Sequence, residues 1–534
     1  MPSKRLHVFI PPGPTREQES VYPAVIPRGA LIVAGRARRE GWTSTVFDAY
    51  SFPSVTDEFE QQASVGPAVI GLSIHGAPSV PPARRVLDGI RRRRPDTRVI
   101  VGGNLANVAT DLMHGAFGDA LIYGGGADLA GRALAHLLDI EECGVFPAPN
   151  PDTSWDIPDL DSLYIPFDRY LDDPNFEYHL PTQVGCPFRC FHCGTGRPGL
   201  IARTNLRPAE SLAEELDWLM ALCDHQGRPY PHVWITDETF TSAEDHVMAI
   251  CDVFARRPQL QWRAQTRVDC VESRLLRAMK DAGCDTIAFG VEVPTDPGLA
   301  LFGKREVMGR AEYAFHVARD ADLRTQAILV FGAPDDTSTF ADVFETLGDL
   351  RPHSLQTYLY HPVPGSPWWR THGRAFDLAV AEQWGGLDFH SPPLPKLSTD
   401  AMGAVDRFLA SIVWTACAEK TEAVLQWRSR LLGGYPCPRC ASMIQGYLFQ
   451  THDTVDIIRI ACDSNVVLVA LGSSELVAYA LSQSRKNIYS SLMWVLDSTH
   501  DVAASLFCGR CGETALAAAR MHMGDNDCRE IAKP

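Results

Sequence analysis

Short apolar segments alternate with helical patterns along much of the chain, and this alternation restricts the possible folds more than any other feature. In the first 145 residues the apolar segments are 6–10, 45–48, 68–73, 98–103 and 120–124, and helical patterns include 28–39 and 83–94. Apolar strands separated by helices are typical of parallel, doubly wound sheets. The sequence therefore predicts an N-terminal α/β domain that binds ligands beyond the carboxyl ends of its strands.

The same alternation resumes downstream, where the apolar segments are 233–236, 261–266, 286–291, 325–331 and 354–360. This pattern predicts a (β/α) barrel or part of one, with its chemistry at the carboxyl ends of the strands. A Pro- and Asp-rich stretch between the two domains is expected to be a linker. The predicted parts are a first domain at 1–145, a linker at 146–175, a partial barrel at 176–375, a helical segment at 376–430 and a Cys-rich domain at 431–534.

Composition excludes several partners and directs attention to the thiols. Lys and Arg number 49 against 65 Asp and Glu, so the net charge of -16 argues against nucleic acid or an anionic membrane as the main partner. No apolar run approaches the roughly 18 residues of a membrane span, and Met1–Arg5 leads directly into a strand, so we expect a cytoplasmic protein. The 15 cysteines of such a chain are unlikely to form disulfides, so a tight group of them indicates metal ligation.

Three cysteines are grouped in one short loop, at Cys186, Cys190 and Cys193. Soft thiolates at this spacing suit an iron–sulfur cluster or zinc. In a cubane cluster, three cysteines leave one of four irons open, and that iron could chelate a substrate through amino and carboxylate groups. The alternative is a structural zinc site that takes a fourth ligand such as His192, although structural zinc normally pairs CxxC with another CxxC or with histidines.

The CxxxCxxC pattern after a strand resembles the signature of the radical S-adenosylmethionine (SAM) superfamily. Downstream segments resemble further motifs of that superfamily in order: Ile235–Phe240, Trp262–Asp269, Phe289–Glu292, Phe331–Pro334 and His361–Ser366. The resemblance implies a [4Fe-4S] cluster on the three cysteines, which would be catalytic. It implies SAM contacts from Phe191, His192, Asp237, Glu238, Arg267, Glu292 and Pro334. His192 stands where the superfamily usually has an aromatic residue near the adenine, and imidazole is also planar.

The first domain resembles the Rossmann-like cobalamin-binding domain of cobalamin-dependent radical SAM enzymes. The resemblance implies cobalamin contacts from Ser73, His75, Gly102, Gly103, Asn104, Tyr123, Gly124 and Gly125. Two departures stand out: Gly124–Ala127 lacks the acidic residues common there, and no DxHxxG motif follows Asp48 to supply a cobalt ligand. His75 is a candidate ligand, with a hydrogen-bonded loop histidine as the alternative. A degenerate scaffold without any ligand is the alternative for the whole domain.

The C-terminal domain contains two CxxC pairs of zinc-ribbon type, Cys437 with Cys440 and Cys508 with Cys511. Four thiolates form a closed tetrahedral site, which favours structural zinc; a second iron–sulfur cluster is the competing interpretation. Between the pairs, segments 466–471 and 493–497 with an intervening helical pattern predict a small α/β insertion.

The resemblance implies a cobalamin-dependent radical SAM methyltransferase that acts on an unactivated carbon of a small metabolite or natural-product intermediate. Such an enzyme would take electrons from an external donor such as flavodoxin or ferredoxin and would require neither nucleic acid nor membrane. The alternative within the family is rearrangement or cyclisation without methyl transfer. The alternative from another class is a non-catalytic, metal-stabilised binding module.

Overall fold

The structure is a computed structural model in which the described residues fall mainly between 4 and 367. They are 4–12, 15–16, 19–20, 24–65, 69–76, 79–103, 105–106, 117, 120–123, 144–147, 155–173, 176–194, 204–293, 295–304, 308–331, 346, 349–350, 352, 354–359, 366–367 and seven strands beyond residue 429. The chain divides into two compact units. The first comprises residues 1–265, 278–285 and 362–388, and the second comprises 266–277, 286–361 and 389–534.

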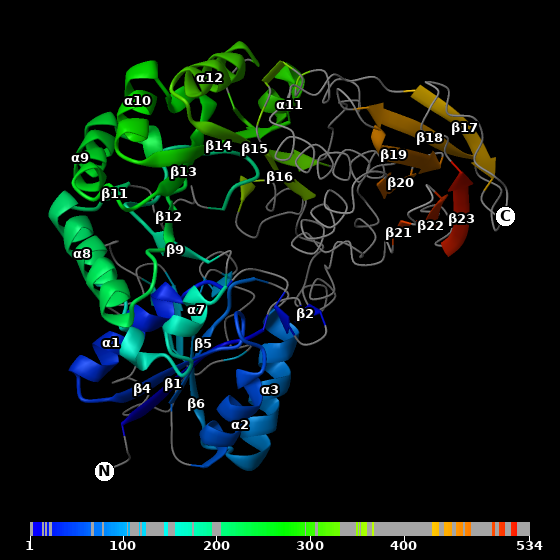
Figure 1. The fold of residues 1–534 in the computed structure, drawn as a ribbon. Helices are drawn as coiled ribbons and strands as arrows, with labels where there is room; N and C mark the ends of the chain where they lie inside the picture. Colours follow the sequence, from blue (N-terminus) through cyan, green and yellow to red (C-terminus); the bar gives the residue numbers. More distant parts are fainter. Residues whose placement is uncertain are drawn as a thin grey trace. The chain divides into compact units, whose positions relative to one another are not determined.

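The N-terminal domain is built on a six-stranded parallel sheet (Figure 1). Its strands in spatial order are β4 (Thr43–Asp48), β1 (Arg5–Ile10), β5 (Val69–Ser73), β6 (Arg98–Gly102), β7 (Ala120–Tyr123) and β8 (Gly144–Pro147). The helices are α1 (Arg28–Arg39), α2 (Val55–Val65) and α3 (Val80–Arg93), and a short hairpin pairs β2 (Thr15–Arg16) with β3 (Glu19–Ser20). The predicted doubly wound fold is confirmed, and β8 extends it beyond the expected boundary at residue 145.

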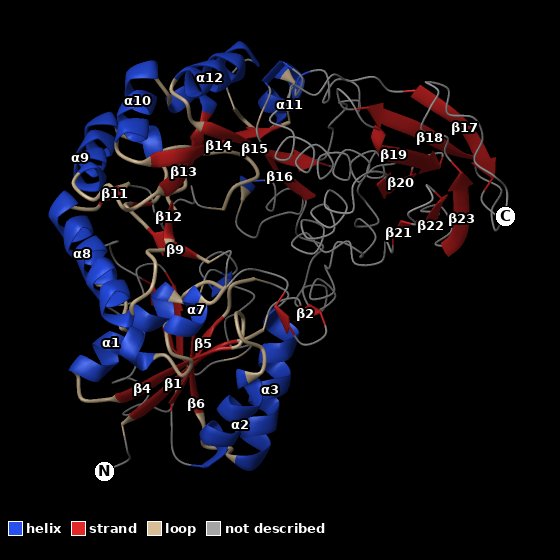
Figure 2. Ribbon diagram, viewed as in Figure 1, coloured by secondary structure: helices blue, strands red, loops and turns tan. Residues whose placement is uncertain are grey.

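Helices cover both faces of this sheet because the direction of the crossovers reverses after β4. Figure 2 shows α1 on one side of the strands, with α2 and α3 on the other. Between α2 and the sheet, Phe9 stacks on Phe59 at 4.2 Å between ring centroids, and Phe47 packs against Phe59 at 5.4 Å. All three rings are fully buried, so each contributes about 1.5–3 kcal/mol of hydrophobic free energy. This core fixes the strands whose ends form the candidate ligand site.

The second sheet also has six strands, which follow one another in chain order. They are β9 (Glu177–Leu180), β12 (His232–Ile235), β13 (Trp262–Arg267), β14 (Cys284–Glu292), β15 (Arg324–Phe331) and β16 (Ser354–Leu359). The connecting helices are α8 (Ala209–Gln226), α9 (Glu244–Ala255), α10 (Ser273–Asp281), α11 (Asp296–Leu301) and α12 (Met308–Asp320). Its end strands β9 and β16 are not neighbours in the sheet order, as expected for part of a barrel. The predicted architecture is confirmed, although its first strand, β9, begins before the predicted alternation.

Charged side chains join the amino-terminal ends of four of these strands, β9, β12, β13 and β14. The His232 ring nitrogens lie 3.1 Å from Glu177 Oε1 and 2.8 Å from Asp285 Oδ2. Arg263 donates two hydrogen bonds to Glu177 and lies over the Trp234 ring at 4.0 Å from its centroid. In barrels the end opposite the chemistry serves stability. These ion pairs therefore hold the strands in register, leaving the carboxyl ends for ligands.

The C-terminal strands are antiparallel. One sheet orders β17 (Arg430–Pro436), β18 (Met443–Gln450), β19 (Val455–Cys462) and β20 (Asn465–Ala470), and another orders β21 (Trp494–Leu496), β22 (Asp501–Phe507) and β23 (Thr514–Arg520). The two predicted strands of the α/β insertion, β20 and β21, lie in different sheets and pair antiparallel, so the expected parallel pairing between them is wrong. The segment between them, which is expected to be helical, lies outside the described residues. The predicted helical segment at 376–430, apart from its last residue, and the four ribbon cysteines lie outside the described residues.

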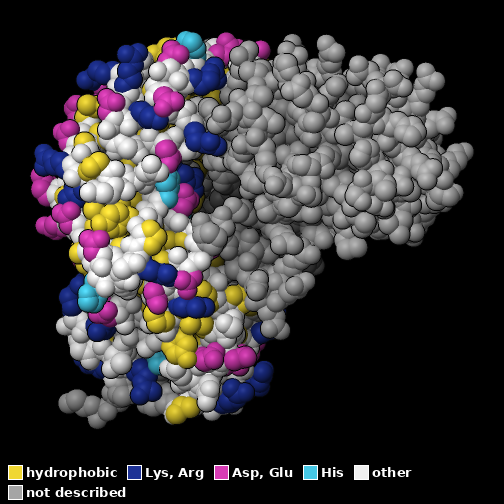
Figure 3. All heavy atoms as spheres, in the orientation of Figure 1, with side chains coloured by type: hydrophobic (Ala, Val, Ile, Leu, Met, Phe, Trp, Pro, Cys, Tyr) yellow, Lys and Arg dark blue, Asp and Glu magenta, His cyan; other side chains and the backbone are white. Residues whose placement is uncertain are grey.

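Charges of both signs are intermixed over the face of the described residues drawn in Figure 3. None of the described helices has the length and apolar character needed to cross a membrane.

Candidate functional site

The three-cysteine loop directly follows a short strand, as the sequence predicts. Strand β10 (Gln183–Val184) pairs with β11 (Asn205–Leu206), and Gly185 then turns the chain with a φ of 92°, a conformation that favours glycine. Cys186, Cys190 and Cys193 form no disulfide and are partly exposed, and the Cys193 amide donates to the Cys190 carbonyl at 3.2 Å. Thiols of this kind fit an iron–sulfur cluster. No group of three metal ligands is assembled within the described part of the chain, so these ligands remain a prediction.

The residues just before Cys186 are held by the carboxyl end of β12. Asp237 accepts hydrogen bonds from the amides of Thr182 at 2.7 Å and Gln183 at 3.0 Å, and from the Thr182 hydroxyl. Gln183 in turn donates to the Thr239 carbonyl at 2.8 Å, and the Thr239 hydroxyl lies 3.4 Å from Cys186 Sγ. We call Pro181–Gln183 the stem of the loop. The stem is therefore held by hydrogen bonds to the Asp237 carboxylate and to the Thr239 carbonyl.

The two carboxylates predicted to lie near SAM have different surroundings. Asp237 is 1% exposed, and burial raises its pKa to about 7 although its three hydrogen bonds, two of them from stem amides, oppose that shift. Glu238, the next residue, is exposed. Asp237 is thus committed to the stem, and Glu238 is the carboxylate that a ligand can reach. Thr182 and Thr239 were not singled out from the sequence, although Thr239 lies inside the Ile235–Phe240 motif.

The next two strands carry their predicted polar residues at their carboxyl ends. Arg267 ends β13 and forms a bidentate pair with Asp269, at 2.9 and 2.8 Å. Glu292 ends β14 and lies 3.1 Å from Lys304 Nζ, which also donates to the Gly290 carbonyl at 2.6 Å. A Cβ on Gly290 would lie 2.9 Å from Glu292 Oε1, so glycine leaves room for this buried pair.

Glu292 has a φ of 60°, which non-glycine residues rarely adopt. Strain of this kind concentrates at functional sites, which agrees with a ligand-binding role for the end of β14. Phe191, 43% exposed, and the partly buried His192 lie on the cysteine loop. Pro334 lies outside the described residues.

The predicted cobalamin residues occupy the carboxyl edge of the first sheet. Ser73 and Gly102 are paired at the ends of β5 and β6, and His75 follows on an exposed loop with its ring 5.5 Å from Tyr50. The strand order reverses between β1 and β5, the point at which doubly wound sheets bind ligands. Tyr123 ends β7 and its side chain is not described; Asn104, Gly124 and Gly125 lie outside the described residues.

Gly103 explains how two loops approach one another at this edge. Its φ is 93°, and a Cβ there would lie 2.6 Å from both the nitrogen and the oxygen of Ile74. Ile74 donates to the Gly102 carbonyl at 2.9 Å and accepts from Leu105 at 3.0 Å. Glycine at position 103 therefore lets the loops after β5 and β6 pack backbone against backbone at the edge where the cobalamin contacts are predicted.

Two family models match the chain. The B12 binding domain matches residues 19–133, and the radical SAM superfamily matches residues 180–347. An uncharacterized methyltransferase of Pyrococcus horikoshii is 26% identical over 43% of this chain and 48% of its own length. An anaerobic magnesium-protoporphyrin IX monomethyl ester cyclase of Cereibacter sphaeroides is 24% identical over 54% of this chain and 48% of its own. The chain thus spans about half the length of the curated relatives it matches.

Solved structures share the fold. The radical SAM methyltransferase TsrM from Kitasatospora setae, with tryptophan substrate and a SAM analog bound, matches with a TM-score of 0.55 at 16% identity, covering 68% of this chain and 75% of its own. The cobalamin-dependent SAM radical enzyme OxsB, with aqua-cobalamin and SAM bound, matches with a TM-score of 0.55 at 12% identity, covering 79% and 74%. The chain therefore carries a B12-binding domain followed by a radical SAM domain.

Proposed function

We propose that this protein is a cobalamin-dependent radical SAM methyltransferase that methylates an unactivated carbon of a small metabolite or natural-product intermediate. The observation that carries the proposal is the CxxxCxxC loop at the start of a radical SAM domain, in the same chain as a B12-binding domain. The name of the Pyrococcus horikoshii relative also supports methyl transfer.

The chain's own residues bind and orient the cofactors. Cys186, Cys190 and Cys193 hold the [4Fe-4S] cluster, and the exposed carboxylate of Glu238 receives the amino group of SAM. Phe191 and His192 offer planar surfaces to the adenine, and Arg267 and Glu292 border the same ligand. When bound, the cluster, SAM and cobalamin supply the electron transfer, the radical and the methyl group.

On the first domain, the edge formed by Ser73, Gly102 and Gly103 holds the cobalamin, with Asn104, Tyr123, Gly124 and Gly125 as further contacts. His75 is exposed and near Tyr50, so it is accessible as a ligand of the cobalt. The required electrons would come from a donor of the flavodoxin or ferredoxin class.

The test is anaerobic reconstitution with iron, sulfide and cobalamin, followed by reduction in the presence of SAM. The wild-type protein should retain on the order of four irons per chain and form 5′-deoxyadenosine. Cys190→Ala should lose both, whereas Cys251→Ala, at a buried cysteine on α9, should keep both. SAM cleavage by Cys190→Ala at the wild-type rate would refute the cluster assignment. Absence of 5′-deoxyadenosine from the fully metallated wild type would instead favour a binding module.

A second function, cyclisation or rearrangement without methyl transfer, is favoured by the 24% identity to the cyclase. Product masses separate the two functions, because only methylation adds one CH₂ to the substrate.

Zinc on Cys437, Cys440, Cys508 and Cys511 also remains a proposal. Metal analysis should find one zinc that Cys437→Ser removes; loss of iron instead would indicate a second cluster.

A further inference from the structure

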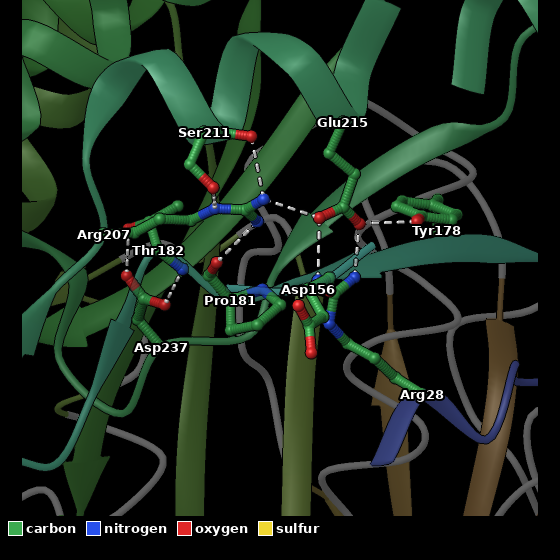
Figure 4. Close-up of polar contacts among 9 residues, drawn as sticks. All are labelled: Arg28, Asp156, Tyr178, Pro181, Thr182, Arg207, Ser211, Glu215 and Asp237. Carbon is green, nitrogen blue, oxygen red and sulfur yellow. Dashed lines mark hydrogen bonds and ion pairs between the residues drawn. The ribbon is translucent and has the colours of Figure 1, made fainter. Parts of the chain in front are cut away.

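A buried carboxylate joins the two cofactor domains within the first unit. Glu215, on α8 of the radical SAM domain, has a fully buried side chain. It forms a bidentate ion pair with Arg28 on α1 of the B12-binding domain, with Arg28 Nη2 at 2.7 Å from Oε2. Its two oxygens also accept from the Tyr178 hydroxyl at 2.6 Å and from Arg207 Nη2 at 2.7 Å (Figure 4). The three residues that donate to this carboxylate come from three different segments of the chain.

Arg207 carries this group on to the stem of the cysteine loop. Its amide donates to the Thr182 carbonyl at 2.8 Å, and its Nη1 donates to the Pro181 carbonyl at 3.4 Å. The guanidinium is fixed from the other side by the hydroxyl and carbonyl of Ser211, at 3.2 and 2.9 Å. Pro181 and Thr182 are also the residues that precede the Gly185 turn into Cys186. A continuous set of polar contacts therefore runs from α1 to the stem.

The charges show why this set acts as a unit. Two guanidinium groups share one buried carboxylate, so the group has a net charge of +1 in an interior where unpaired charge is costly. Burial opposes ionisation of Glu215, but Arg28 and Arg207 outweigh it and lower the pKa of the carboxyl. Glu215 therefore stays ionised and holds both arginines, which would otherwise be buried without a counter-ion.

We propose that Glu215 is a positioning residue, which couples docking of α1 of the B12-binding domain to the placement of the cluster loop. Arg28 donates to Glu215 and to the Asp156 carbonyl. Glu215 connects Arg28 to the stem through Arg207 and through Tyr178, whose strand β9 leads directly into Pro181. The proposal rests on the proposed function only in assigning the cluster to Cys186, Cys190 and Cys193.

Hydrogen–deuterium exchange of the metal-free, full-length chain tests the coupling directly. Arg28→Met leaves Glu215 and Arg207 as a neutral pair, so this variant should still fold. We expect exchange of residues 177–186 to accelerate about tenfold or more, which corresponds to about 1.4 kcal/mol. The matched control is Arg38→Gln, which removes a more exposed ion pair between the same helix and Asp159 and should leave residues 177–186 unchanged. Acceleration confined to α1 in Arg28→Met would overturn the proposal.

A second measurement follows the cluster itself. In reconstituted protein, the EPR spectrum or midpoint potential of the cluster should change in Arg28→Met and not in Arg38→Gln. An unchanged cluster together with unchanged exchange at 177–186 would also overturn the coupling. If the wild type assembles no cluster, the proposed function fails, while the exchange measurement still decides whether α1 and the stem are coupled.

Discussion

Replacing Asp237 by alanine should loosen the stem of the cysteine loop, because three buried donors converge on this one carboxylate. The amides of Thr182 and Gln183 share Oδ1, and the Thr182 hydroxyl donates to Oδ2. Thr182 and Gln183 are 0% and 4% exposed, so water cannot readily replace the lost acceptor. At about 1–3 kcal/mol for each of the three unsatisfied buried donors, Asp237→Ala should cost roughly 3–9 kcal/mol.

Asp237→Asn is the matched control, since its amide oxygen can still accept from both backbone amides. Its effect should depend on pH. The raised pKa, about 7 instead of 3.8, means that the folded state keeps a proton that the unfolded state has lost between these values. Stability contributed by this group is therefore present below pH 4 and is lost as the pH rises through 7, by up to about 4 kcal/mol. Asp237→Asn should remove that loss and be at least as stable as wild type at pH 8.

The assay is hydrogen–deuterium exchange at Thr182 and Gln183 in the metal-free protein. Asp237→Ala should accelerate exchange of these amides at least tenfold, and Asp237→Asn should not. SAM affinity of the reconstituted protein gives an independent check, because Glu238→Gln should weaken it and Asp237→Asn should not. If Asp237→Asn weakens SAM binding as much as Glu238→Gln does, Asp237 binds the ligand directly and its role as a purely structural acceptor for the stem is refuted.

Three further substitutions test other parts of the molecule. Gly103→Ala should strain its loop against Ile74, lower the melting temperature and weaken cobalamin binding in a spectral titration, whereas Gly29→Ala, on α1 with open space at its Cβ, should do neither. Burial opposes the charged form of His232, but hydrogen bonds to Asp285 and Glu177 outweigh it and raise the pKa of His232 to about 9. The charged imidazole should therefore add about 3 kcal/mol of stability, fully present below pH 6.5 and lost as the pH rises through 9. The melting temperature of His232→Gln should accordingly vary less over that range than that of the wild type. Lys304→Met should leave the Glu292 carboxylate buried without its cation and lower the free energy of unfolding, measured by chemical denaturation, by about 3–5 kcal/mol. Adding Glu292→Gln should recover most of that loss, and no recovery would contradict the pairing.

Periodicity in the sequence predicted the longer elements but failed for short strands and for the direction of strand pairing. Helix α1 begins and ends at the predicted residues 28 and 39, because its buried alanines and leucine recur at helical spacing. Strand β9 was missed because Glu177 and His179 alternate with Tyr178 and Leu180 in a segment too short to stand out. The antiparallel C-terminal strands were read as α/β because apolar segments do not by themselves reveal the direction of pairing.

The polar contacts around the site could not be predicted in the same way, since they depend on residues far apart in the chain. Arg28 and Glu215 are 187 residues apart, and Thr182 and Asp237 are 55 apart. Motif spacing located Asp237 and Glu238 together but could not separate their roles. Only burial shows that one carboxylate faces the stem and the other faces solvent.

Asp237 holds the stem while Glu238 faces solvent, and this difference bears on how the cysteine loop is positioned. The cysteine loop has little regular structure, so its placement must come from its ends. At the amino-terminal end, Asp237 fixes the stem from β12, and Arg207 fixes it from the side of α8. Because Glu215 links Arg207 to Arg28, a shift of α1 cannot leave the stem unaffected unless buried charges are separated. Ligand geometry in the radical SAM domain should therefore respond to the packing of the B12-binding domain, even for substitutions that touch neither cofactor.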